Sequence, residues 1–377
     1  MELDKFGLNV EQTEILYNVE MYKTIYDINE TSMPLLKDKV INLKSQWLTE
    51  WKKYMESGFP DFVQNKGAKL HWYTREELFE KVKENKPMGV WFRLVLLEAM
   101  LFEPYYTLSL EKDKDGNEVP SKKYDMLQNP VNQCKKGTGD KFLDNFFGVD
   151  IYQKGYVKRL RKTYDHVMME LNEVLKSAIK GLAITAGVTI AAVITAGALA
   201  PSIAVALVGS NFAGLSGAAL TSACLAYLGG GAVAVGGFGM AGGTAAIVGG
   251  GALLGVGVGA MAGGTASAVS VLGKKNTIMQ SAKLMVAVRE IFLNDEHDLD
   301  YSNSVYEQYV NNIELVQKQL GDLQRKENVS SKEEKKQLKI EIKNTEESIN
   351  AMMIAMKSMR KYQSAFEEGL KYGGYGN

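Results

Sequence analysis

A run of 93 residues, from Gly181 to Gly273, contains no Asp, Glu, Lys, Arg or His. A soluble domain of average composition carries about one charged residue in four. Charge is costly in a bilayer or in a sealed protein interior, so a run of this length indicates one of those surroundings. The run also holds 23 of the chain's 37 glycines, which makes it only mildly apolar. We therefore expect a segment that can be packed in protein or inserted in lipid.

Pro201, Ser210-Asn211 and two triple-glycine breaks divide the run into apolar blocks. The blocks are Leu182–Ala200, Phe212–Leu228, Ala232–Val248 and Ala252–Leu272. About 20 helical residues cross a bilayer, so the run supplies two long crossings or up to four short ones. The flanking lysines are Lys176, Lys180, Lys274 and Lys275. They are expected to stay at the headgroup level of one membrane face, which predicts an even number of crossings.

A glycine zipper is the main oligomerisation motif of the run. Gly251, Gly255, Gly259 and Gly263 recur at a spacing of four, and Gly239 and Gly243 repeat that spacing. A helical face made of such residues lets backbones approach closely and favours helix association in lipid. We expect these glycines to form the contact between subunits.

Two other interpretations of the run stay open: the buried core of a soluble protein, and a permanent membrane anchor. Glycine costs roughly 1 kcal/mol in a helix relative to Ala, so a run that needed only burial would favour Leu and Ile. Its aromatic residues are Phe212, Tyr227 and Phe238, and it has no Trp. Permanent spans carry aromatic belts at both interfaces, so conditional insertion fits better.

Residues 1–155 are predicted to form a separate, mostly helical N-terminal domain. Apolar residues spaced by three and four indicate helices at 9–28, at 88–102, and from Thr31 or Ser32 to about Ser57. The segment 88–102 is too short and too charged to span a bilayer, so a buried core helix is expected there.

Three shorter motifs lie in the same region. Thr74 and Glu77 have the spacing of a capping box. Asp115-Gly116 is a typical turn for a hairpin within residues 105–125. The segment Lys136-Gly137-Thr138-Gly139-Asp140-Lys141 lacks the spacing of a phosphate-binding loop, so an ordinary loop is expected.

Long amphipathic helices are predicted on both sides of the run. Residues 156–180 form one, with a seam from Leu160 to Ala178 at spacings of four and three. Residues 274–372 form others: one to about Leu293, one at 302–327, and a last one capped by Ser331 and Glu334, whose seam from Leu338 to Leu370 includes Met352, Met356 and Met359. Residues 373–377 are expected to be a disordered tail. The predicted fold class is therefore mainly α: an elongated long-helix bundle with an apolar glycine-rich helical hairpin region and a separate N-terminal helical domain.

No catalytic, metal or cofactor site is expected. His71, His166 and His297 are far apart in sequence, and Cys134 and Cys224 cannot form a disulfide framework. The formal net charge is zero, which gives no reason to expect a nucleic-acid partner. The acidic, polar N-terminus lacks a signal peptide, so we expect a cytoplasmic soluble form and a membrane-bound active form. Secretion without a signal peptide stays open.

Two glycine-rich segments carry a resemblance to known proteins. Ala226–Gly231 and Gly236–Gly243 resemble the apolar block of a set of bacterial proteins and, more distantly, small interferon-inducible membrane proteins. The order of elements, with an amphipathic helix, an apolar glycine-rich hairpin and further amphipathic helices, resembles the α-helical pore-forming toxins of the haemolysin E and Bacillus tripartite-toxin type. That resemblance implies a hairpin that is shielded in the soluble form, then inserts and oligomerises.

The expected function is membrane permeabilisation, by a bacterial toxin or a defence effector. Its expected partners are a lipid bilayer and further copies of the chain, with residues 1–155 sensing a trigger or binding a protein partner. The alternative is a permanently membrane-anchored coiled-coil scaffold without pore activity. An enzyme within residues 1–155 also stays open.

Overall fold

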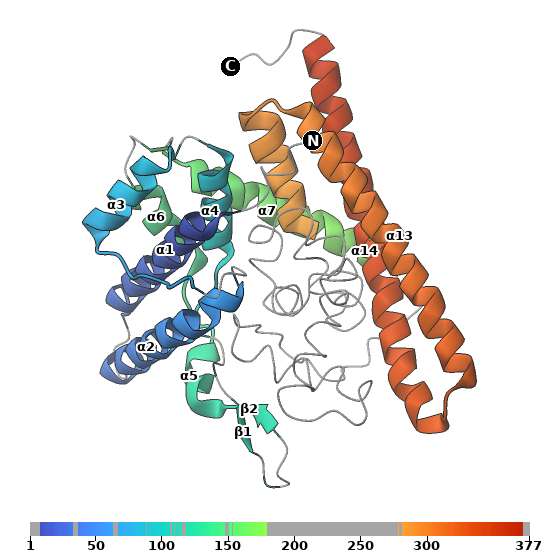
Figure 1. The fold of residues 1–377 in the computed structure, drawn as a ribbon, viewed down its shortest axis with the longest axis horizontal. Coiled ribbons are helices and arrows are strands. Elements are labelled where there is room, and N and C mark those ends of the chain that lie inside the picture. The colour runs from blue at the N-terminus through green and yellow to red at the C-terminus, as the bar shows by residue number, and fades with distance from the viewer. Residues whose placement is uncertain are drawn as a thin grey trace.

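The computed structural model describes residues 8–32, 37–62, 67–87, 89–105, 108, 110–112, 114, 118–147, 151–152, 154–178, 278 and 281–371. These residues are mainly helical, which confirms the predicted fold class at that level (Figure 1). The run 181–273, and with it all six zipper glycines, lies outside the described residues, as do Lys180, Lys274, Lys275 and the tail 373–377. Lys176 lies in a described helix, but its side chain is not described.

The N-terminal part consists of helices and one short hairpin. Its elements are α1 (Val10–Asn29), α2 (Lys37–Phe62), α3 (Arg75–Glu84), α4 (Val90–Leu101), β1 (Leu110–Lys112), β2 (Glu118–Pro120), the 3-10 helix η2 (Lys122–Tyr124), α5 (Asp125–Gln128) and α6 (Lys136–Phe146). The helices expected at 9–28 and 88–102 are confirmed as α1 and α4. The strands β1 and β2 pair antiparallel, with Leu110 opposite Pro120, as the hairpin prediction required. The predicted turn, Asp115-Gly116, lies outside the described residues.

Side-chain caps define the starts of α1 and α3. Asn9 Oδ1 accepts a hydrogen bond from the Gln12 backbone N–H at 2.9 Å, and Gln12 Oε1 accepts one from the Asn9 N–H at 3.0 Å. Thr74 and Glu77 form the same reciprocal pair at α3, which confirms the predicted capping box. Each box satisfies backbone N–H groups that have no partner within the helix.

The helix α2 extends beyond its predicted end. The sequence predicted an end near Ser57, but the helix continues through Gly58 and Pro60 to Phe62. Phe59 is buried and packs edge-on against Tyr17 of α1, with ring centres 6.1 Å apart. Burial of that ring keeps the last turn helical despite an unfavourable local sequence.

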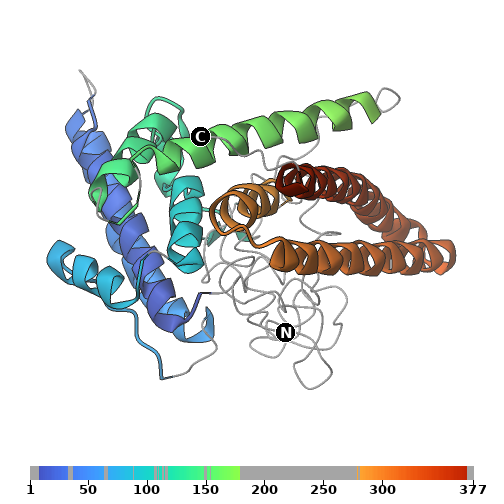
Figure 2. The ribbon, with the colours of Figure 1, turned by 90° about the horizontal axis from the view of Figure 1, so that it is seen from above.

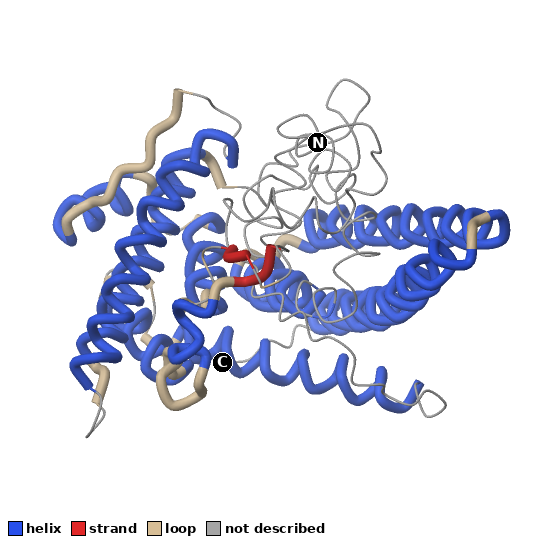
Figure 3. Tube along the Cα trace, turned by 90° about the horizontal axis from the view of Figure 1, so that it is seen from below, coloured by secondary structure: helices blue, strands red, loops and turns tan. Residues whose placement is uncertain are grey.

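The C-terminal part is built from longer helices. These are α7 (Tyr156–Ala178), a helical segment from Ser281 that becomes the π-helix η5 (Ala287–Asp295), then α13 (Leu299–Val329) and α14 (Lys332–Lys371). Figures 2 and 3 show α13 and α14 side by side, with α7 extending toward them from the N-terminal helices. The predicted cap of the last helix is confirmed, because the Ser331 N–H donates to Glu334 Oε2 at 3.0 Å.

The predicted seam of α14 faces inward. Its buried members are Leu338, Thr345, Ile349, Met352, Met359, Gln363 and Phe366. Met356 is partly buried, so the methionine-rich part of the seam packs against the other helices. The sequence predicted an ordinary helix to about Leu293, whereas η5 has π geometry, with the Glu296 N–H donating to the Ile291 carbonyl at 3.0 Å.

The apolar core continues across residue 155. Val95 of α4, Leu160 of α7 and Phe292 of η5 belong to one cluster of buried side chains. The boundary of a separate N-terminal domain near residue 155 therefore stays a prediction, because the helices on its two sides share this core.

The expectation of a loop at 136–141 is wrong, since these residues begin α6. Tertiary contacts explain the helix. Phe142 and Phe146 pack against Tyr26 and Tyr22 of α1, with ring centres 5.1 and 5.3 Å apart. Gly139 is also buried, and a Cβ at this position would lie 2.6 Å from Lys23 Cε. A glycine that looked like a loop signal is instead needed for close helix packing.

Gly139→Ala is expected to destabilise the fold, although Ala favours helix by roughly 1 kcal/mol over Gly. The added methyl group would displace Lys23, whose ammonium group is held by three backbone carbonyls. Gly137→Ala in the same helix is the matched control, because nothing lies within 4 Å of its new Cβ. Urea unfolding should show a loss for Gly139→Ala and no loss for Gly137→Ala; equal effects would contradict the packing role of Gly139.

Candidate functional site

The two helices that bracket the uncharged run are fixed to each other. Thr163 Oγ1 of α7 donates to Glu290 Oε1 of η5 at 2.7 Å, and Arg159 Nε lies 3.2 Å from Glu290 Oε2. The Tyr156 hydroxyl donates to Asp295 Oδ2 at 2.8 Å. Burial and the neighbouring Asp295 carboxylate raise the pKa of Tyr156, which keeps this hydroxyl a donor. These contacts lie at the ends of the two helices that are farther from the run in sequence.

A buried charge cluster lies deeper, where α1 and α4 meet the helix that follows the run. It consists of Glu20, Lys23, Glu98 and Lys283, all of them buried. Glu98 Oε1 forms an ion pair with Lys283 Nζ, and each side chain is only 5% exposed. Burial raises the pKa of Glu98 to about 7, although Lys283 acts in the opposite direction. Burial also lowers the pKa of Lys283, so each partner depends on the other to remain charged.

Lys23 is the member of this cluster that binds the C-terminal end of α4. Its ammonium group donates to the carbonyl oxygens of Ala99, Met100 and Phe102 at 2.7, 3.2 and 2.7 Å. These carbonyls lie at the C-terminal end of α4, where helix carbonyls have no partner within the helix and a cation is favoured. Lys23 therefore fixes α1 to the end of the helix that carries Glu98.

A partly buried ion pair holds α7 on the N-terminal helices. Arg161 Nε and Nη2 bind the two carboxylate oxygens of Asp140 at 2.8 and 3.0 Å. Nη2 also donates to the Met100 carbonyl at 2.7 Å. A two-pronged guanidinium–carboxylate pair fixes both distance and orientation. The start of α7 is therefore tied to α6 and α4 at one point.

A cleft of ≈ 720 Å³ lies between α7, η5 and α14. Its lining comprises the polar side chains His166, Glu170, Arg289, Asn294, Lys361 and Tyr362, together with the apolar side chains Met169, Leu293, Ala365 and Phe366. The cleft is lined by α7 and η5, the helices that bracket the run, and by α14.

The three histidines have different neighbours. His71 Nδ1 lies 2.9 Å from Glu14 Oε1, His297 packs near the Phe366 ring, and His166 lines the cleft. Among the described residues, no group of three or more His, Cys, Asp or Glu side chains has the arrangement of a metal site.

The sequence-predicted membrane residues cannot be compared with these contacts, because they lie outside the described residues. Sequence reasoning missed the buried charge cluster. One signal was present: Glu98 is the one acidic residue of a strongly apolar helix whose other charged residue is Arg93, and a buried charge requires a partner. Its partner Lys283 is remote in sequence and gave no sign of the pairing.

Comparisons of the chain with protein-family models, with curated proteins and with solved structures find no match. In the part of the chain that the structure describes, none of the helices has the length and apolarity needed to cross a bilayer.

Proposed function

We propose that this chain is a membrane-permeabilising protein, a bacterial toxin or defence effector, whose uncharged run inserts into a bilayer and oligomerises through its zipper glycines. The observation that carries the proposal is the run itself, 93 residues without a charged side chain between two amphipathic helices. Apolar surface exposed to water costs about 25 cal/mol per Å². The run therefore needs a cover of protein in water, and a bilayer can replace that cover.

The described contacts support this proposal in one respect. The bracketing helices α7 and η5 are tied to each other by Glu290, and α7 is tied to the N-terminal helices by the Arg161–Asp140 pair. The helices joined in this way can keep their shared core while the run between α7 and η5 moves from a protein environment into lipid. The resemblance in layout to helical pore-forming toxins is consistent with that division of roles.

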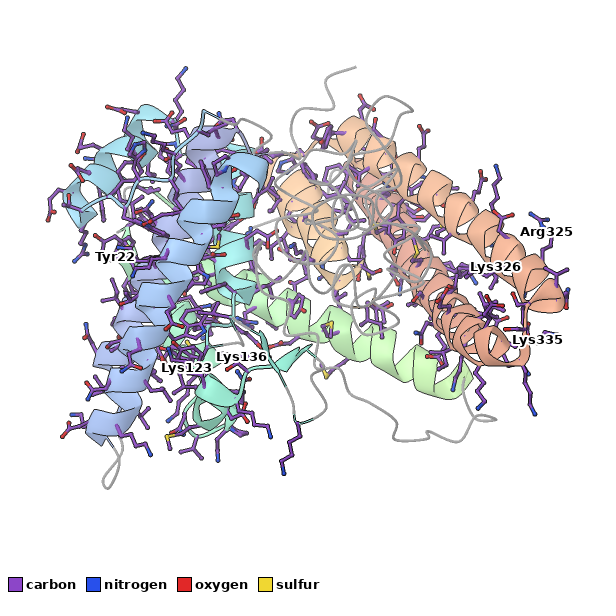
Figure 4. The ribbon with its side chains drawn as sticks, turned by 60° about the horizontal axis from the view of Figure 1, so that its bottom comes forward. Tyr22, Lys123, Lys136, Arg325, Lys326 and Lys335 are labelled. Atoms are coloured by element: carbon purple, nitrogen blue, oxygen red, sulfur yellow. The ribbon has the colours of Figure 1, made fainter. Side chains whose placement is uncertain are left out.

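The end of the α13–α14 pair provides a second supporting feature. Figure 4 shows Arg325, Lys326 and Lys335 around this end of the molecule. Val329, the last residue of α13, is 86% exposed. Each basic residue near an anionic membrane surface contributes about 1 kcal/mol to attraction. In this proposal, that end of the molecule meets the bilayer first.

The partners that follow are a lipid bilayer, further copies of the chain on the membrane, and a trigger or protein bound by residues 1–155. The proposal includes a cytoplasmic soluble form, a membrane-bound active form, and no enzymatic or nucleic-acid role. The competing proposal is a permanently anchored coiled-coil scaffold, which would be found only in membrane fractions and would be harmless when expressed.

Release of an entrapped dye from liposomes tests the proposal. The full chain, purified without detergent, is expected to release dye, and a variant lacking residues 181–273 is not. Circular dichroism of the variant checks that its helices remain folded. Assays at neutral and acidic pH, and after mild proteolysis, cover the common triggers. A full chain that releases no dye under any of these conditions would contradict permeabilisation and favour the scaffold.

A further inference from the structure

The cleft between α7, η5 and α14 has the size of a small-molecule site. Its volume of ≈ 720 Å³ lies within the range of roughly 300–1,000 Å³ that ligand pockets occupy. Three helices contribute side chains, so its shape depends on tertiary packing and not on one loop. It offers charged groups that can fix the orientation of a ligand, beside the apolar side chains of Met169 and Ala365.

The acidic side chain in the cleft is already engaged by its neighbours. Glu170 Oε1 accepts a hydrogen bond from Ser358 Oγ at 2.8 Å, and Glu170 Oε2 accepts one from the Tyr362 hydroxyl at 3.5 Å. These bonds hold the carboxylate on the α14 wall. These hydroxyl donors leave the negative charge of Glu170 in place, so it offsets one of the two basic side chains of the cleft, Arg289 and Lys361.

Two basic side chains line the cleft, Arg289 of η5 and Lys361 of α14. The Arg289 guanidinium lies 5.2 Å from the Tyr362 ring centre, and its Nε lies 3.4 Å from Glu290 Oε1. A guanidinium has five N–H donors in a planar fork, so Arg289 retains donors for a further carboxylate or phosphate. Stacking on Tyr362 fixes the plane of that fork.

The apolar part of the cleft includes an exposed methionine. Met169 is 58% exposed, unusually high for a large apolar side chain, and it lines the cleft together with the exposed Ala365, whereas Leu293 and Phe366 are buried and contribute little surface. Methionine adapts to irregular apolar partners. This surface suits a flexible hydrocarbon chain.

The π geometry of η5 contributes to the same wall. Arg289 and Asn294 are five residues apart, and both line the cleft. Hydrogen bonds between residues five apart, such as Glu296 N–H to the Ile291 carbonyl, bring positions at that spacing onto one face. Single π turns are frequent at functional sites, and this helix has nine residues in that geometry.

We infer that this cleft binds a single-chain anionic amphiphile. Its carboxylate or phosphate head is held by Arg289 and Lys361, and its hydrocarbon chain lies on Met169 and Ala365. The inference rests on the described residues alone and does not depend on membrane permeabilisation. A free fatty acid and an anionic membrane lipid share this chemistry.

Titration calorimetry with laurate, below its micelle concentration, tests the inference on the full chain. Laurate is expected to bind one to one, whereas dodecyltrimethylammonium, with a similar chain and a cationic head, is not. Arg289→Gln should weaken laurate binding at least about tenfold, as expected for a lost charge-assisted hydrogen bond. Lys357→Gln, also on α14 but outside the cleft lining, is the matched control and should bind as the unmodified chain does.

Met169→Glu provides a second variant in case Arg289→Gln disturbs η5. Its site is exposed, so the fold should tolerate it, and its carboxylate should repel the anionic head. Absence of laurate binding, or equal binding by the unmodified chain and Met169→Glu, would overturn the inference. Sedimentation with phosphatidylglycerol vesicles then identifies the source. Weaker vesicle binding by Arg289→Gln would indicate a membrane lipid, and unchanged vesicle binding a free fatty acid.

Discussion

Lys283→Met is expected to lower the free energy of unfolding by about 3–5 kcal/mol, the usual cost of removing one partner of a buried ion pair. The side chains of Lys283 and Glu98 are each 5% exposed and form an ion pair between the helix after the run and α4. Methionine fills a similar volume but leaves the Glu98 carboxylate without its counter-charge. Urea unfolding followed by circular dichroism measures the loss.

The loss should be larger at pH 8 than at pH 5. The pKa of Glu98 is already raised from 4.5 to about 7 by burial, and removal of Lys283 raises it further. At a pH between its unfolded-state and folded-state pKa values, a carboxyl group with a raised pKa binds a proton in the folded state that it does not bind in the unfolded state. Stability is therefore lost as pH rises from about 4.5 through the folded-state pKa. The opposite pH dependence would contradict a buried, ionised Glu98.

Two controls separate the charge effect from general disruption. Glu98→Leu combined with Lys283→Met removes both charges and should restore most of the stability, because paired burial of charge often contributes little net stability. Lys83→Met breaks an exposed pair with Glu80 and should change stability by less than about 1 kcal/mol. If Lys283→Met costs no more than Lys83→Met, the pair does not stabilise the contact between α4 and the helix after the run.

Local sequence signals predicted the helices of this chain well. The Thr74–Glu77 and Ser331–Glu334 caps and the seam of α14 depend on residues three or four apart, and all are present in the structure. These features follow from helix geometry alone. The mainly α fold class could therefore be predicted from the sequence without knowledge of the tertiary packing.

Features that depend on distant residues were not predictable in the same way. Gly139 reads as a loop residue until Lys23 of α1 is known to fill the space beside it. Glu98 and Lys283 read as separate polar positions, because periodicity does not identify partners remote in sequence. The Arg289–Tyr362 contact in the cleft, and the π geometry beside it, likewise arise only when α14 packs against η5.

Gly259→Leu is expected to abolish dye release by the full chain. In the proposed membrane form, the run of glycines at a spacing of four lets neighbouring helix backbones approach closely. A leucine side chain at the centre of that face would separate the backbones and remove the packing that replaces the hydrophobic effect in lipid. Dye release from liposomes, with equal amounts of protein bound to the vesicles, measures the effect.

Gly257→Leu is the matched control, since it makes the same change two residues away in the same run. Residues two apart do not share a helix face, so this leucine would point away from the zipper and should leave release largely intact. Both variants should keep the helical circular dichroism and urea unfolding of the unmodified chain. Dye release by Gly259→Leu at the rate of the unmodified chain would show that the zipper glycines do not form the contact between subunits. An equal loss of dye release in both variants would show that the run is sensitive to added volume in general. It would then give no evidence that the subunits meet at Gly251, Gly255, Gly259 and Gly263.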